Sequence, residues 1–207
     1  MRYGQRACDS TTLDRTAAGP GGFLTVMNVW TIGHSTRSSG ELIAVLRSHG
    51  IEAVADVRRF PGSRRLPQFS EQALASELPT HEIDYRWIPA LGGRRRSSLN
   101  SPNSGWRHAA FRAYADYVAT EEFAEGLSEL MMIAGGLRTA IMCAEILWWR
   151  CHRRIIADVL TSLGVHVEHL RDERPGELHR LAAPARLVDG VLTYSVATPR
   201  REVRRSS

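Results

Sequence analysis

The chain has 207 residues, of which 43% are hydrophobic, and this length and composition suit one globular domain with its own packed core. Its formal net charge is +5, and because the sequence contains no lysine, all 27 basic residues are arginine. Guanidinium groups bind phosphate and carboxylate through paired hydrogen bonds. The charge therefore favours an anionic ligand, although arginine codons in a GC-rich genome also explain it.

Cysteine content and hydropathy exclude two classes of protein. The cysteines Cys8, Cys143 and Cys151 are too few, and odd in number, for a secreted disulfide framework. No stretch reaches the roughly 18 apolar residues that a membrane span needs. Charged residues interrupt the N-terminus where a signal peptide would lie. We therefore expect a soluble, cytoplasmic protein with no membrane partner.

Short apolar runs alternate with amphipathic stretches from residue 26 onward. Residues 1–25 have no hydrophobic period, and we expect them to form a disordered leader, with Met27 as an alternative start. Periodicity and capping residues predict the following elements. Strands are expected over 26–32, 52–57, 83–89, 137–142 and 165–170, and helices over 41–46, 71–78, 109–118, 121–133 and 155–160.

This alternation predicts an α/β fold. We expect a mostly parallel central sheet of about five strands with helices on both faces, a three-layer sandwich of the rhodanese-like or Rossmann-like type. The domain is predicted to span residues 26–172, followed by a C-terminal tail over 173–207. Within that tail, Asp189-Gly190 favours the turn of a small hairpin.

The richest chemistry lies where the fourth strand passes into the fifth helix. Two thiols, a carboxylate, an imidazole and several guanidiniums fall within residues 143–154. In open α/β sheets, ligands bind at this kind of crossing. The positive potential of a helix N-terminus and of nearby arginines lowers the pKa of a thiol and favours the thiolate. Glu145 would oppose this for Cys143, and a buried core thiol is the alternative.

Polar side chains also follow the first and second strands. Because the carboxyl ends of parallel strands meet at one edge, we expect these side chains to converge on the thiols. The predicted catalytic residues are Cys143, Glu145, Cys151, His152 and His34. The predicted anion-binding residues are Ser35, Asp56, Arg58, Arg59, Ser63, Arg64 and Arg153. The thiol spacing matches no standard zinc motif, so no metal ligand is predicted. A shared zinc ion including His34 and a redox disulfide remain alternatives.

These motifs together resemble a family of bacterial and archaeal proteins, the domain of unknown function 488. The resemblance covers about residues 28 to 171, and Trp148 departs from it, standing where related sequences tend to carry proline. It rests on Thr31–Ser35, Asp56–Arg64, Pro67–Ser70, Leu91–Gly93, Tyr114–Tyr117, Cys143–Glu145 and Trp149–Arg153. The family brings no established activity with it. The order of strand, cysteine, loop and helix is also similar to rhodanese-like domains, a likeness of fold that does not fix function.

We therefore carry several hypotheses about function. The first is an enzyme acting on an anionic substrate that bears phosphate, sulfur or a nucleotide, with a thiol nucleophile, a histidine acid/base and an arginine clamp. The second is a nucleic-acid or nucleotide binding module without catalysis, suggested by the basic loop at Arg94–Arg96. The third is a Cys/His metal-binding protein, and the fourth a buried ion network that only fixes the fold. The sequence leaves the cofactor, the reaction and the oligomeric state open.

Overall fold

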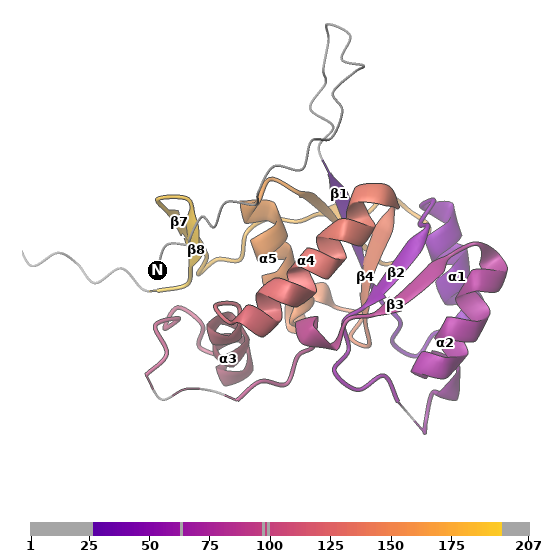
Figure 1. The fold of residues 1–207 in the computed structure, drawn as a ribbon, viewed down its shortest axis with the longest axis horizontal. Coiled ribbons are helices and arrows are strands. Elements are labelled where there is room, and N and C mark those ends of the chain that lie inside the picture. The colour runs from indigo at the N-terminus through magenta and orange to yellow at the C-terminus, as the bar shows by residue number, and fades with distance from the viewer. Residues whose placement is uncertain (1–26, 63, 97, 99, 196–207) are drawn as a thin grey trace, which may run out of the picture.

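A computed structural model describes residues 27–195 except 63, 97 and 99 (Figure 1). The predicted leader, Cys8 and Ser63 lie outside the described residues. A six-stranded sheet runs through the centre in the order β3-β2-β4-β1-β5-β6. Its strands are β1 (Asn28–Gly33), β2 (Ala53–Asp56), β3 (Asp84–Trp87), β4 (Thr139–Cys143), β5 (His166–Leu170) and β6 (Glu177–Leu178). All pairs are parallel except β5 with β6, so the predicted fold class is confirmed and β6 is an unpredicted addition.

Helices cover both faces of the sheet (Figure 1). They are α1 (Ser39–Ser48), α2 (Glu71–Glu77), α3 (Ala109–Tyr117), α4 (Glu121–Gly136) and α5 (Arg153–Ser162). Side chains of α1 and α2 pack with Ile32 and Val54 in one core cluster. Side chains of α3, α4 and α5 pack with Val29, Ala55 and Ile141 in the other. Two apolar clusters on opposite faces of one sheet make the predicted three layers.

Side-chain caps fix where the helices begin. Ser38 and Glu41 form a capping box at the start of α1, each side chain bonding the other residue's backbone amide. Ser70 accepts the amide of Ala73 at the start of α2, and Thr120 caps α4. Such caps each stabilise a helix by about 1 kcal/mol. The caps of α1 and α2 end the loops that follow β1 and β2, and so fix these two loops at the carboxyl ends of their strands.

A topological switch point lies between β1 and β4. The chain leaves β1 for α1 on one face and leaves β4 for α5 on the opposite face. Gly33 pairs with Cys143, and beyond the strands the amide of His34 donates to the Cys143 carbonyl at 3.0 Å. A Cβ on Gly33 would lie 2.0 Å from the Glu145 carbonyl oxygen, so only glycine fits. Ligands bind at such points in open α/β sheets.

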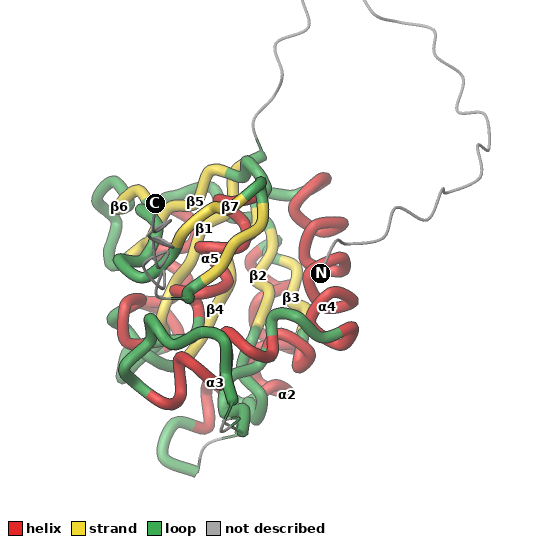
Figure 2. Tube along the Cα trace, turned by 90° about the vertical axis from the view of Figure 1, so that its left-hand side faces the viewer, coloured by secondary structure: helices red, strands yellow, loops and turns green. Residues whose placement is uncertain are grey.

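The described part of the C-terminal segment packs on α5. Asp189 and Gly190, both with positive φ, turn the hairpin of β7 (Arg186–Val188) and β8 (Val191–Thr193). This hairpin lies beside α5 (Figure 2). Tyr194 follows it and is buried in the core cluster of α5. Among the described residues, no helix is long and apolar enough to cross a lipid bilayer.

Candidate functional site

The structure brings three of the predicted site residues together. Cys143 ends β4, and Cys151 lies between a short 3-10 turn (Trp148–Arg150) and α5. Both thiols are buried and neither forms a disulfide. The two sulfur atoms and a ring nitrogen of His152 lie within 4.8 Å of one another. The thiols therefore share one small site with an imidazole.

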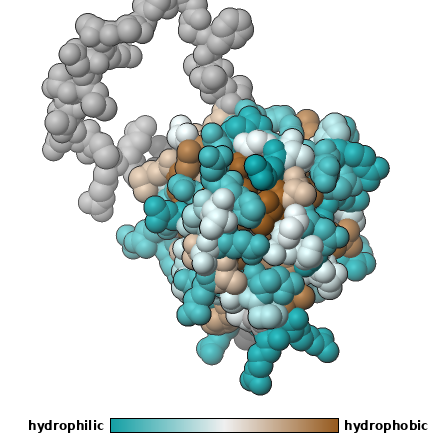
Figure 3. Space-filling view, turned by 90° about the vertical axis from the view of Figure 1, so that its right-hand side faces the viewer, coloured by the Kyte–Doolittle hydropathy of each residue, from teal (hydrophilic) through white to brown (hydrophobic). Residues whose placement is uncertain are grey.

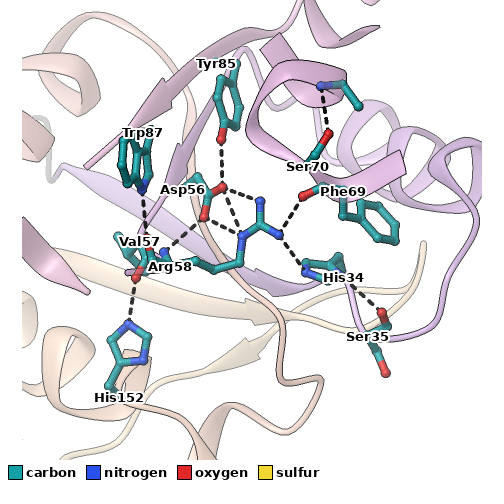
Figure 4. Close-up of polar contacts among 11 residues, drawn as sticks. His34, Ser35, Asp56, Val57, Arg58, Phe69, Ser70, Tyr85, Trp87 and His152 are labelled. Carbon is teal, nitrogen blue, oxygen red and sulfur yellow. Dashed lines mark hydrogen bonds and ion pairs between the residues drawn. The ribbon is translucent and has the colours of Figure 1, made fainter. Parts of the chain in front are cut away.

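The orientation of His152 is set by the chain after β2. Its Nε2 lies 3.0 Å from the carbonyl oxygen of Val57, which only accepts hydrogen bonds (Figure 4). Nε2 therefore carries a proton, and Nδ1 faces Cys151 Sγ at 3.4 Å, where it can take the thiol proton. Gly93 leaves room for this ring, since a Cβ there would lie 2.9 Å from Nδ1. A carbonyl and a glycine together aim the imidazole at Cys151.

The two thiols have opposite acidities. Burial raises the pKa of Cys151. Three effects lower it by more: the hydrogen bond from the Cys143 thiol, the adjacent His152, and the charge of Arg153. The pKa of Cys151 therefore lies well below the usual value. The same hydrogen bond, together with burial, raises the pKa of Cys143 well above its usual value. The geometry thus makes Cys151 the thiolate and Cys143 the thiol that donates to it.

Arg153 places a buried positive charge beside the thiols. Arg153 is only 1% exposed to solvent. Nη1 donates to Thr31 Oγ1 at 3.3 Å, Nη2 donates to the Glu145 carbonyl, and Nε has no hydrogen-bond partner. Within the described residues, no carboxylate forms an ion pair with it. Because burying an unpaired charge is costly, this guanidinium favours a nearby anion, either the Cys151 thiolate or a bound ligand.

A chain of buried hydrogen bonds leads away from that guanidinium. Thr31 Oγ1 lies 2.7 Å from His169 Nδ1, and His169 Nε2 lies 2.9 Å from His179 Nδ1. His179 Nε2 lies 2.9 Å from a carboxylate oxygen of Asp158, whose other oxygen accepts the hydroxyl of Tyr194 at 2.9 Å. Burial and the neighbouring His179 lower the pKa of His169 to about 2, so its ring is neutral. The chain links the buried cation to a buried carboxylate.

A second buried network surrounds Arg58 (Figure 4). Its guanidinium donates to the Asp56 carboxylate from Nε at 2.8 Å and from Nη2 at 2.5 Å. Nη1 donates to the Phe69 carbonyl at 2.7 Å and lies 3.1 Å from His34 Nε2. The Tyr85 hydroxyl donates to the same carboxylate at 2.8 Å. Protein groups thus occupy the donors of Arg58, which suits a structural ion network better than an anion clamp.

His34 belongs to this network and not to the thiol site. Its Nδ1 lies 3.0 Å from the Ser35 carbonyl oxygen, and its ring stacks on Phe69 with centroids 4.2 Å apart. Burial and the charge of Arg58 lower the pKa of His34 to about 4. Both ring nitrogens of this neutral imidazole are occupied. The structure therefore offers His34 neither as a base for a thiol nor as a metal ligand.

The model of the family described as Domain of unknown function DUF488 matches residues 38–160, more than half of the chain. The chain belongs to the DUF488 family. The matched range contains both the thiol cluster and the Asp56–Arg58 pair, and it begins after His34 and Ser35. No curated protein and no solved structure matches the chain.

The remaining predicted site residues of this DUF488 protein include one backbone contact with the thiols, from Glu145 to Cys143. The Glu145 carboxylate accepts the amide of Leu147 at 3.0 Å and so shapes its own loop. Ser35 adopts a left-handed φ of 48° at the end of the β1 turn. Arg59 is half-buried, and Arg64 is exposed on the loop after β2. No hydrogen bond between described residues joins the Glu145 carboxylate to either sulfur.

The thiol cluster of the DUF488 protein is also a set of metal donors. Two thiolates and an imidazole suit zinc or copper(I). A metal-ligating histidine commonly donates its second nitrogen to a carbonyl, as His152 does to Val57. No other comparable set of metal donors occurs among the described residues.

An open cavity of about 420 Å³, lined by Arg37, Glu41 and Arg171 among others, lies apart from the thiols.

Proposed function

We propose that this DUF488 protein is an enzyme in which Cys151 acts as a thiolate nucleophile on a substrate bearing an anionic group. The observation that carries the proposal is the set of contacts around one sulfur atom. Cys151 Sγ lies 3.4 Å from Nδ1 of His152 and accepts the thiol hydrogen of Cys143. A base held in one tautomer beside a thiol is the usual arrangement for activating cysteine.

The step that this geometry supports is nucleophilic substitution at the substrate. Transfer of the Cys151 proton to His152 Nδ1 produces the thiolate before the substrate reacts. The thiolate then forms a bond to the electrophilic atom, while the bond to the leaving group breaks. The leaving group takes the electron pair of that bond and receives the proton from His152. Cys143 stabilises the thiolate before attack by its hydrogen bond. Sulfur, phosphoryl and other group transfers all follow this scheme.

Arg153 accounts for the anionic group on the substrate. Its charge balances the thiolate before attack, and this balance ends once the sulfur forms a covalent bond. An anion on the substrate then restores neutrality beside the buried guanidinium. The unpartnered Nε of Arg153 offers one donor for that anion. Of the predicted clamp residues, Arg153 is thus the one with a free donor beside the thiols.

Alkylation with iodoacetamide, mapped by mass spectrometry, tests the proposal. We expect Cys151 to react at pH 6, Cys143 to react only above pH 8.5, and inorganic phosphate or sulfate to slow the reaction at Cys151. Arg153→Lys should weaken this protection, whereas the neighbouring change Arg154→Lys should preserve it. An ordinary thiol titrates near pH 8.5. Equal reactivity of the two thiols, or indifference to anions, would exclude the proposed nucleophile.

Metal binding is the second candidate, favoured by the donor atoms within 4.8 Å of one another. In that case the protein purified without chelator should contain about one zinc or copper per chain, the stoichiometry of a single three-ligand site. Cys143→Ser should abolish that metal and leave the fold intact. Protein that is free of metal and does not take up zinc at micromolar concentrations would exclude this candidate.

A further inference from the structure

Phe60 exposes an aromatic ring on the loop that follows β2. The residue is 67% exposed, although it is among the most apolar of side chains. The guanidinium of Arg59 lies over the ring, 5.8 Å from its centroid. An exposed aromatic ring with arginine beside it is typical of platforms on which nucleic-acid bases stack. The ring therefore suits a binding partner that offers a flat, apolar face.

Five arginines lie on the loop that carries Phe60 and on the loop that begins at Gly92, and we call them the arginine rim. Its members are Arg59, Arg64, Arg65, Arg94 and Arg96, all exposed or half-buried. Both loops lie below the carboxyl ends of the strands in Figure 1, and Figure 3 shows hydrophilic side chains projecting from that end. No ion pair between described residues involves a member of the rim. The rim is thus a concentration of positive charge without acidic partners.

The two loops of the rim contact each other. Arg59 Nη1 lies 3.4 Å from the Arg94 carbonyl oxygen. Gly92 packs on the backbone of Arg59, where an added Cβ would lie 2.8 Å from Cα. Arg95 stays out of the rim, because its guanidinium stacks 3.5 Å from the centroid of Tyr117 and pairs with Glu122. The structure thus separates the arginines that hold the protein together from those that face solvent.

The rim borders the thiol site through a single glycine. Gly93 follows the contact with Arg59 and lies on His152 Nδ1, the nitrogen that faces Cys151. Gly93 is half-buried, so the backbone beside His152 is reachable from the rim. A long ligand held by the rim would therefore extend toward His152, whose Nδ1 faces Cys151.

We propose that Phe60 and the arginine rim bind single-stranded nucleic acid, and that a nucleotide of the bound strand is the substrate of Cys151. The second half rests on the proposed function, and the first half does not. Guanidiniums contact the phosphates and Phe60 stacks on a base, which requires no particular sequence. A duplex keeps its bases stacked inside, and an acidic peptide offers no base to the ring. The single strand alone uses both features.

Fluorescence anisotropy with labelled 12-nucleotide RNA and DNA strands tests the binding surface. Phe60→Ala should weaken binding at least about fivefold, the effect of one lost base stack. The double change Arg64→Gln with Arg94→Gln should reduce the slope of log affinity against log salt by about 1.4, since each phosphate contact on a single strand contributes about 0.7. The matched controls are Met132→Ala, 72% exposed on α4, and Arg47→Gln on α1, which should bind as the wild type does.

Each outcome decides a part of the proposal. The strand that binds more tightly, RNA or DNA, identifies which nucleic acid the surface prefers. Three results would overturn the proposed binding surface. They are no binding at low salt, an affinity of Phe60→Ala equal to that of the wild type, and tighter binding of the matching duplex than of the single strand. If the strand binds but leaves iodoacetamide alkylation of Cys151 unchanged, the surface stands and the strand is not the substrate. If Cys151 is an ordinary thiol and the strand still binds, the proposed function fails alone.

Discussion

Cys151 Sγ lies 3.4 Å from His152 Nδ1, and this contact exists because the opposite nitrogen of the ring donates to a backbone carbonyl. That carbonyl belongs to Val57, directly after β2, whereas the thiol precedes α5. The base and nucleophile of the candidate site are thus adjacent in sequence but are aligned by a strand far away along the chain. Any change that rotates the ring should disable the sulfur without unfolding the protein.

Gly93→Ala tests this alignment. The new Cβ would lie 2.9 Å from Nδ1 of His152, so the ring has to move away from Cys151. We expect the pH profile of Cys151 alkylation to move upward by about one unit, with a tenfold slower reaction only at pH values below the Cys151 pKa. The control is Gly40→Ala in α1, where an added Cβ has nothing within 4 Å. A variant as reactive as the wild type would show that the ring position does not matter.

Asp56→Asn tests the role assigned to the Arg58 network. The change leaves a buried guanidinium without its carboxylate, and such losses destabilise a protein by about 3 kcal/mol or more. Asp172→Asn is the matched control, because its pair with Arg174 is on the surface and should leave the unfolding midpoint unchanged. The measurement is urea unfolding. A small effect of Asp56→Asn on stability, together with loss of anion protection at Cys151, would instead indicate that Asp56 and Arg58 take part in anion binding.

Stability should fall in mild acid because of His34. Its pKa is about 4 in the folded protein and about 6.5 when unfolded, so the unfolded chain binds the proton more readily between these values. The contribution is fully present above pH 6.5 and is lost as the pH falls toward 4. His169, whose pKa is lowered to about 2, acts in the same direction. Urea unfolding from pH 7 to 4.5 should show the loss, and His34→Gln should flatten it. An identical pH slope in this variant would contradict the assignment.

The C-terminal segment is predicted to stabilise α5 through Tyr194. Removing its hydroxyl in Tyr194→Phe leaves one buried oxygen of Asp158 without a donor. We expect a loss of about 1–3 kcal/mol in the free energy of unfolding. Ser195→Ala, next to it but exposed, is the control. Equal stability of the two variants would mean that the segment is not anchored at Asp158.

Local sequence rules predicted the fold well. The predicted helices begin directly after Ser38 and Ser70, which cap α1 and α2, because capping depends only on residues within one turn. The parallel sheet followed from the alternation of strands and helices. The short strand β6 was missed, because two residues carry no periodic signal and pair with β5 only through tertiary contacts.

The candidate site was predicted only in part. Cys143, Cys151 and His152 are near one another in sequence or at neighbouring strand ends, and the structure brings them together. His34 and Arg58 also lie at strand ends, yet they bond to each other, and sequence does not show which polar groups pair inside. The hydrogen-bond chain that runs from Arg153 to Asp158 was not predicted, because His179 lies in the expected tail and Asp158 in an expected helix.

Titration of the thiolate absorbance at 240 nm tests the central claim most directly. The wild type and Cys143→Ser should be compared with Cys151→Ser in metal-free buffer from pH 4 to 10. We predict a thiolate in the wild type that forms well below pH 8.5, the usual range of a free thiol, and that is absent in Cys151→Ser. A wild-type protein in which neither Cys143 nor Cys151 ionises below pH 8.5 would contradict the account, because Cys151 would then be an ordinary buried thiol.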